Sequence, residues 1–140
     1  MPLHPPSFEA INAALFQQLP PAQWERLVAQ TAVLDIEPQD LGFVEIYWHL
    51  AAIIPTHWTI VDIGCAYAPQ AFFFEQHKAY IGIDPMVSIR FAGANTTHYT
   101  LCARDFLATH ATSFDPKETF AICAYNPMWG EGTTEPLRRA

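Results

Sequence analysis

The stretch WTIVDIGCAYAP, residues 58–69, decides the fold. It begins with a short β-branched and apolar run, 58–63, and Gly64 follows that run at once. Three later runs have the same character: AYIGID at 79–84, HYTLC at 98–102 and FAICAY at 120–125. Short, nearly continuous apolar runs bounded by turn residues are typical of strands buried on both faces of a parallel sheet.

The segments between these runs have the length and composition of helical crossovers. Residues 69–77 predict a helix with Phe72 and Phe73 on one side. Residues 105–110 predict a single helical turn. Strands that alternate with helices predict an α/β fold with a right-handed, doubly wound parallel sheet. We expect the strand order third, second, first, fourth, with the first and fourth strands beside a ligand crevice.

The first 55 residues are expected to be helical and to pack on a core formed by residues 56–140. Ser7 can cap a first helix. A second helix begins at Pro21, because proline suits the first turn of a helix. A third apolar pattern follows, and Pro55 ends it. The apolar faces of these helices are too narrow for a core of their own, so we expect no separate N-terminal domain.

The composition excludes several classes of protein. The chain has 140 residues, of which 51% are hydrophobic and 15% charged, and this excludes a disordered chain. The formal net charge is −7, and the only basic cluster is Arg138-Arg139, so binding to nucleic acid by this chain alone is not expected. No run of about 18 apolar residues occurs, so the sequence predicts no membrane span.

The three cysteines are expected to be small buried thiols. Cys65, Cys102 and Cys123 form no C-x-x-C pair, and no metal-ligand spacing accompanies them. We therefore expect no metal site. The odd number of cysteines and the lack of a signal peptide predict free thiols in a reducing, cytoplasmic location.

Gly64 and Asp84 are the residues that point to a ligand. Ligands of doubly wound sheets bind beyond the carboxyl ends of the strands. Gly64 permits a tight turn there and lets backbone amides approach an anionic group. Asp84 ends the second run and can accept hydrogen bonds from two ribose hydroxyls. The alternative is an ordinary strand-to-helix turn, with Asp84 before Pro85 capping the next segment.

Residues 61–65, VDIGC, resemble the opening of the first motif of the class I S-adenosylmethionine-dependent methyltransferases. That motif is an acidic residue followed by glycines, in the pattern D-x-G-x-G-x-G. Ala66 and Ala68 stand at its second and third glycine positions. The resemblance covers roughly the second half of the chain. It implies an incomplete, three-layer, Rossmann-like methyltransferase core with S-adenosylmethionine as the cofactor.

The same resemblance implies a set of cofactor-binding residues. The loop 64–68 faces the methionine part, Asp84 holds the ribose, and Asp105 accepts a hydrogen bond from the exocyclic amine of adenine. The implied set is Asp62, Gly64, Cys65, Ala66, Asp84, Asp105 and Phe106. For Asp105 the alternative is a helix N-cap, which is a common place for an aspartate.

A further stretch, Asn126-Pro127-Met128-Trp129, resembles the (Asn/Asp)-Pro-Pro-aromatic motif of enzymes that methylate an exocyclic or amide nitrogen. The resemblance implies that Asn126, Pro127 and Trp129 are catalytic residues. The Asn126 side chain and a backbone carbonyl orient the acceptor nitrogen, and Trp129 stacks on the substrate. The alternative is a proline-containing turn in which Trp129 packs on the edge of the domain.

The edge of the fourth strand is an exposed apolar feature in this scheme. Domains of the resembling family have seven strands, whereas this chain ends shortly after its fourth run. An open apolar edge promotes aggregation unless it is covered. We expect the N-terminal helices, a second copy of the chain or a partner chain to cover residues 120–123.

Three hypotheses on function follow from the sequence. The leading one is a methyltransferase-like protein that binds S-adenosylmethionine and transfers its methyl group to a nitrogen acceptor. The second is a non-catalytic cofactor-binding or regulatory module that retains the fold. The third is a binder of an adenine nucleotide or dinucleotide.

Overall fold

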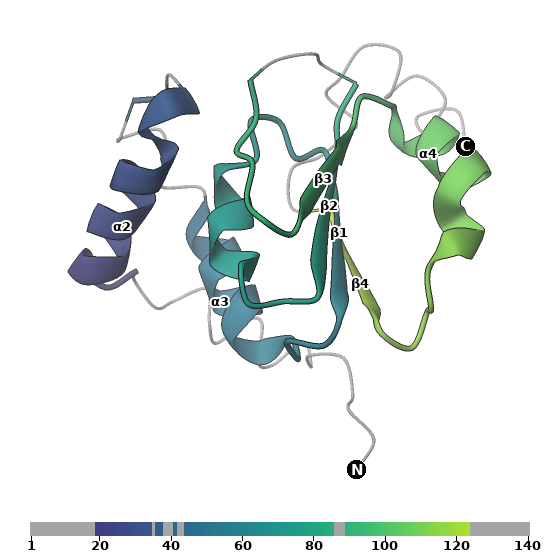
Figure 1. The fold of residues 1–140 in the computed structure, drawn as a ribbon, viewed down its shortest axis with the longest axis horizontal. Coiled ribbons are helices and arrows are strands. Elements are labelled where there is room, and N and C mark those ends of the chain that lie inside the picture. The colour runs from purple at the N-terminus through teal and green to yellow at the C-terminus, as the bar shows by residue number, and fades with distance from the viewer. Residues whose placement is uncertain (1–18, 35, 38–40, 42–43, 86–88, 124–140) are drawn as a thin grey trace.

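A four-stranded parallel sheet forms the centre of the computed structural model (Figure 1). The structure describes residues 19–34, 36–37, 41, 44–85 and 89–123. The strands are β1 Thr59–Ile63, β2 Ala79–Ile83, β3 Thr96–Tyr99 and β4 Thr119–Ile122. Their order is β3-β2-β1-β4 and every pairing is parallel, which confirms the expected α/β fold and strand order.

Helices cover both faces of the sheet and make three layers (Figure 1). On one face lie α3 and the 3-10 helix η3, and α2 packs on η3; their bounds are Glu45–Ile53, Pro69–Phe74 and Pro21–Thr31. On the opposite face lies α4, Ala103–His110. Two short 3-10 helices follow α2 and α4: η1 Ala32–Leu34 and η4 Ala111–Ser113.

The β1 strand is apolar almost throughout because both of its faces are covered. Successive side chains of a strand point to opposite faces of the sheet. Ile60 packs in the larger apolar cluster, on the side of α3, whereas Val61 packs in a smaller cluster with Phe106 of α4. Because both faces are covered, an alternating apolar and polar pattern does not suit this strand.

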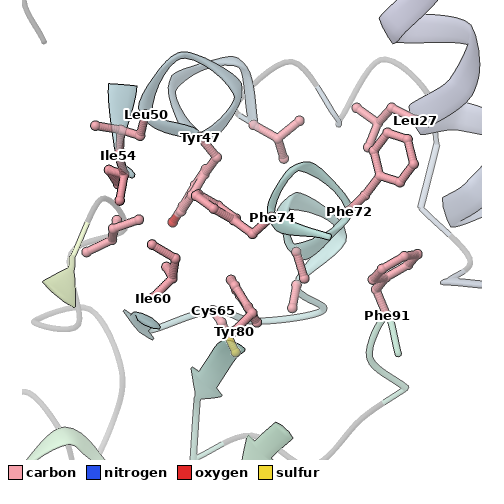
Figure 2. Packing of buried hydrophobic residues seen from close by; sticks show 14 of the residues in the cluster. Leu27, Tyr47, Leu50, Ile54, Ile60, Cys65, Phe72, Phe74, Tyr80 and Phe91 are labelled. Atoms are coloured by element: carbon pink, nitrogen blue, oxygen red, sulfur yellow. The ribbon is translucent and has the colours of Figure 1, made fainter. Parts of the chain in front are cut away.

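The larger core lies between α3, η3 and the sheet (Figure 2). Tyr47 reaches from α3 toward the sheet, and Phe74 and Tyr80 lie beneath it. All three side chains are fully buried, and the rings of Phe74 and Tyr80 stack with centroids 5.8 Å apart. Each buried aromatic side chain of this kind stabilises the fold by about 1.5–3 kcal/mol.

The third strand differs from its prediction. It spans Thr96–Tyr99, whereas the apolar run predicted residues 98–102. Among the described residues this strand pairs with β2 alone, and Ile83, the last residue of β2, lies opposite Tyr99. The strand therefore ends where its partner ends. It begins earlier because the β-branched Thr96 and Thr97 suit an edge strand even though they are not apolar.

Two helix boundaries also differ from their predictions. The helix predicted over residues 69–77 is a 3-10 helix that ends at Phe74. The chain must turn there, because the Lys78 amide donates to the Thr56 carbonyl just before β2 begins. The turn predicted over residues 105–110 is an α-helix that already begins at Ala103.

The N-terminal region contains two of the three predicted helices, α2 and α3. The helix that Ser7 was expected to cap lies outside the described residues. Within the described ranges β4 pairs only with β1, and what covers its other edge stays a prediction. No helix in that part of the chain is long and apolar enough to cross a membrane.

Gly82 lies in β2 at a point where a side chain does not fit. An ideal Cβ at this position is 2.6 Å from Nδ1 of His98 and 2.9 Å from Sγ of Cys65. We expect Gly82→Ala to lower the free energy of unfolding by about 1–3 kcal/mol through overpacking. Gly93→Ala is the control, because its Cβ meets no atom closer than 3.5 Å. Urea unfolding measures both, and equal losses at the two positions would contradict the prediction.

Candidate functional site

The loop 64–68 joins β1 to η3 at the carboxyl edge of the sheet. Its backbone visits the left-handed region at every second residue: φ is 80° at Gly64, 51° at Ala66 and 58° at Ala68. These are the three positions at which the D-x-G-x-G-x-G pattern has glycine. The two alanines therefore adopt the conformation that glycine adopts without strain.

Hydrogen bonds within the protein hold this loop in its strained shape. The amides of Gly64 and Cys65 both donate to the carbonyl of Ile83, at 2.8 and 3.1 Å. The amide of Ala68 donates to the carbonyl of Cys65 at 2.9 Å. The expectation that the amides of the loop face an anionic ligand is therefore not met at these positions, because each already has an acceptor.

Asp84, the residue predicted to hold a ribose, contacts the loop directly. It follows β2, and its Oδ2 accepts a hydrogen bond from the amide of Ala66 at 3.0 Å. The Asp84 carbonyl accepts from Nη2 of Arg90 at 2.8 Å. Asp84 is buried, with 8% of the residue exposed.

Asp62, the acidic residue of the motif, is completely buried on the α3 side of the sheet. Its Oδ1 accepts from the Tyr47 hydroxyl at 3.2 Å, and its Oδ2 accepts from Nε2 of Gln70 at 2.8 Å and from the Tyr80 hydroxyl. Burial raises the pKa of Asp62 to about 6, although these three hydrogen bonds lower it. These contacts make Asp62 a structural centre behind the loop.

Cys65 is also buried, at 1% exposure, and its thiol donates to the carbonyl of Ala66 at 3.6 Å. Burial raises the pKa of this thiol far above its ordinary value, and the nearby Asp62 raises it further. The residue is therefore a poor nucleophile. Among the described residues no cluster of three His, Cys, Asp or Glu side chains is placed to hold a metal ion.

The two residues expected to contact adenine are neighbours in α4 but differ in exposure. Asp105 lies in the first turn of α4 with its side chain 56% exposed, 3.6 Å from Nε of Arg104. Phe106 is 1% exposed and packs on Val61 and Ile81 in the smaller core. Of the two, only Asp105 is accessible to a ligand. The predicted catalytic residues, Asn126, Pro127 and Trp129, lie outside the described residues.

Sequence reasoning missed the polar side chains around Asp62. Gln70 is completely buried, and its Nε2 donates to Asp62 and also to the carbonyl of Cys65, at 3.1 Å. Tyr47 and Tyr80 were predicted only as part of apolar patterns. A signal was present in Gln70, because a polar residue between Pro69 and a run of apolar residues needs a partner when it is buried.

A separate cavity of about 350 Å³ lies between α2, α3 and η3. Its lining includes Arg26, whose guanidinium lies 5.2 Å from the ring centre of Phe72. Neither the loop 64–68 nor Asp84 lines it. Doubly wound sheets bind ligands beyond the carboxyl ends of their strands, and this cavity lies elsewhere.

Comparison with known proteins identifies no relative. A scan against models of protein families, a search of curated proteins and a search of solved structures each found no match. The likeness to class I methyltransferases therefore rests on the sequence motifs and on an α/β fold with a parallel sheet.

The backbone strain at Ala66 can be measured. Left-handed backbone costs an alanine about 1–2 kcal/mol, and glycine loses about 0.5–1 kcal/mol through its extra freedom in the unfolded chain. Ala66 is exposed, so no buried methyl group is lost in Ala66→Gly. We expect this variant to raise the free energy of unfolding by about 0.5–1 kcal/mol.

The control for this prediction is Ala92→Gly. Ala92 is also exposed but has no positive φ, so the substitution is expected to destabilise by about 0.5–1 kcal/mol. Chemical unfolding of both variants gives the comparison. Opposite signs support the strain at Ala66, and a loss of stability in both variants contradicts it.

The buried Asp62 makes stability depend on pH. Its pKa is 3.8 ordinarily and about 6 in the folded protein, so folding binds a proton between these values. Stability is therefore expected to fall as pH rises from about 4 to about 6, by an amount on the order of 3 kcal/mol. Asp62→Asn removes this contribution, because an amide does not titrate.

Denaturant unfolding at several pH values measures this effect as the difference between wild type and variant. Asp115→Asn is the matched control, because Asp115 is exposed and its Oδ1 accepts a hydrogen bond from the amide of Lys117. An Asp62→Asn protein with the same pH slope as the wild type would show that Asp62 titrates normally.

Proposed function

We propose that this chain binds S-adenosylmethionine at the carboxyl edge of β1 and β2. The observation that carries the proposal is the joint geometry of the loop and the acid. The loop 64–68 has a left-handed backbone at the three glycine positions of the motif, and Asp84 bonds to its middle residue. Sequence resemblance and backbone shape thus point to the same five residues and the same acid.

Asp84 is the residue that suits the nucleoside. Its carboxylate stands at the end of β2, where hydroxyls of a ribose can donate to it. The bond from the Ala66 amide to Oδ2 fixes the orientation of the side chain before a ligand arrives. A carboxylate that is already oriented binds with less loss of side-chain freedom.

The hydrogen bonds of the loop favour this ligand over a dinucleotide. A pyrophosphate is held at such a loop by free backbone amides and by the N-terminus of the following helix. Here the amides of Gly64, Cys65, Ala66 and Ala68 donate inside the protein. S-adenosylmethionine has no phosphate, and its one anionic group is the methionine carboxylate.

Methyl transfer to a nitrogen is the reaction that the sequence motif supports. The bound sulfonium supplies an activated methyl group, and orientation alone can provide much of the acceleration of an in-line displacement. Asn126 with Pro127 positions the acceptor nitrogen, and Trp129 stacks on the plane that contains it. This part of the proposal rests on the sequence.

A non-catalytic module with the same fold is the second candidate. The observation that favours it is the internal use of the loop amides together with the 8% exposure of Asp84. In that case the left-handed loop and its acid stabilise the turn after β1 and hold no cofactor. This form of the module differs from the first candidate in its affinity for the cofactor, whereas a non-catalytic module that keeps the cofactor differs from it in methyl transfer alone.

Asp84→Asn separates the two roles of this side chain. An asparagine oxygen still accepts from the Ala66 amide, but the charge-assisted bonds to the ribose are lost. We expect the affinity for S-adenosylhomocysteine to fall at least about tenfold, while the stability of the protein changes little. Calorimetric titration with S-adenosylmethionine, S-adenosylhomocysteine and NAD measures this.

Asp115→Asn is the control for this prediction, because it removes an exposed carboxylate from the loop before β4. If Asp84→Asn binds as tightly as the wild type, the ribose site is assigned wrongly. If the wild type binds neither sulfur ligand at millimolar concentration, the non-catalytic module replaces the methyltransferase proposal. Binding of NAD alone indicates the dinucleotide hypothesis.

A further inference from the structure

Gln70 connects the buried carboxylate to the loop. It is completely buried at the start of η3, and its Nε2 donates to Oδ2 of Asp62 at 2.8 Å and to the carbonyl of Cys65 at 3.1 Å. Both neighbours are acceptors when Asp62 is ionised. The amide must therefore turn its nitrogen, and not its oxygen, toward them.

The other end of this amide has no hydrogen-bond partner. Among the described residues no donor reaches Oε1 of Gln70, although the atom is buried. A buried acceptor without a donor is unfavourable, so a second orientation of the amide can compete when a donor is supplied. Protonation of Asp62 supplies one, because the carboxyl then carries an O–H.

In the second orientation the amide is rotated by half a turn. Oε1 accepts the O–H of Asp62, and Nε2 moves away from the carbonyl of Cys65. The loop then loses the side-chain bond that holds its second residue. The proton comes from solvent and stays on Asp62, so no other group has to change its charge.

We propose that Gln70 is a positioning residue that transmits the protonation of Asp62 to the loop 64–68, and thereby sets the affinity of the ligand site. This inference rests on the proposed cofactor site at that loop. It makes the site proton-sensitive: ligand binds more tightly when Asp62 is ionised, because the loop is then held from behind.

The surroundings of Asp62 support a transition in the accessible pH range. Burial raises the pKa of this carboxyl to about 6. No basic side chain is among the groups that set it. The titratable groups around it come from α3, the loop, β2 and the end of β4: Tyr47, Cys65, Tyr80, Asp84 and Cys123.

Titration of the wild type with S-adenosylhomocysteine between pH 5 and pH 8 tests the inference. We expect the affinity to rise by about threefold to tenfold through a midpoint near pH 6, which is the usual effect of one hydrogen bond. Gln70→Met keeps the length of the side chain but offers no donor. It is expected to bind at all pH values with the weak affinity that the wild type has at low pH.

Asp62→Asn provides the second arm. Its side chain still offers an oxygen to Gln70 but does not titrate, so the affinity is expected to lose the pH dependence with a midpoint near 6. Asp84 is unchanged in both variants, and differences from the wild type therefore report on Asp62 and Gln70. A wild type and Gln70→Met with identical pH profiles overturn the inference.

Nuclear magnetic resonance on the wild type alone separates this inference from the proposed function. The side-chain amide of Gln70 and the backbone amides of Ala66 and Ala68 are expected to shift with one common midpoint near pH 6. These shifts are expected even if no sulfur ligand binds. In that case the proposed ligand is wrong, and the coupling of Asp62 to the loop is still supported. Resonances that do not move with pH overturn the coupling whether or not the variants fold.

Discussion

The buried carboxylate of Asp62 is the constraint on which the rest of the structure depends. It is shielded from solvent, and desolvation opposes its charge. Tyr47 of α3, Gln70 of η3 and Tyr80 of β2 all donate to it. Because these donors come from three different elements, the carboxylate is satisfied only when all three are in place. The helix, the crossover and the two central strands are thereby held as one unit.

Hydrogen bonds from this unit hold the loop 64–68 in its shape. Gln70 holds it from below through the carbonyl of Cys65, and the carbonyl of Ile83 holds its first two amides. Ala66 cannot leave the left-handed region without breaking its bond to Asp84. Strained backbone persists only where the surroundings over-determine it, and such places cluster at functional sites. The strain at the alanines is thus an observation that points to function.

The sequence predicted the sheet well but not the polar network behind the loop, for one physical reason. Strands buried on both faces leave a local apolar pattern, so the four runs predicted the strand order correctly. Both ends of the third strand were predicted wrongly, because it ends where β2 ends and begins at threonines that are β-branched but not apolar. The polar network was invisible, since Tyr47 lies 15 residues from Asp62 and only the fold brings them together. Phe106, expected at the adenine, belongs to the core because α4 turns it inward.

The internal hydrogen bonds of the loop 64–68 limit which ligand it suits. A phosphate group needs free amides and a helix N-terminus, whereas these amides are bonded internally and η3 is a 3-10 helix of six residues. The net charge of −7 further opposes an anion. A ligand that binds here must gain its affinity from uncharged or positively charged parts. The proposed sulfonium nucleoside would meet that requirement, because in the proposal Asp84 accepts its ribose hydroxyls and the net charge of −7 favours a cation. A dinucleotide instead brings two phosphates to a loop in which the amides of Gly64, Cys65, Ala66 and Ala68 already donate inside the protein.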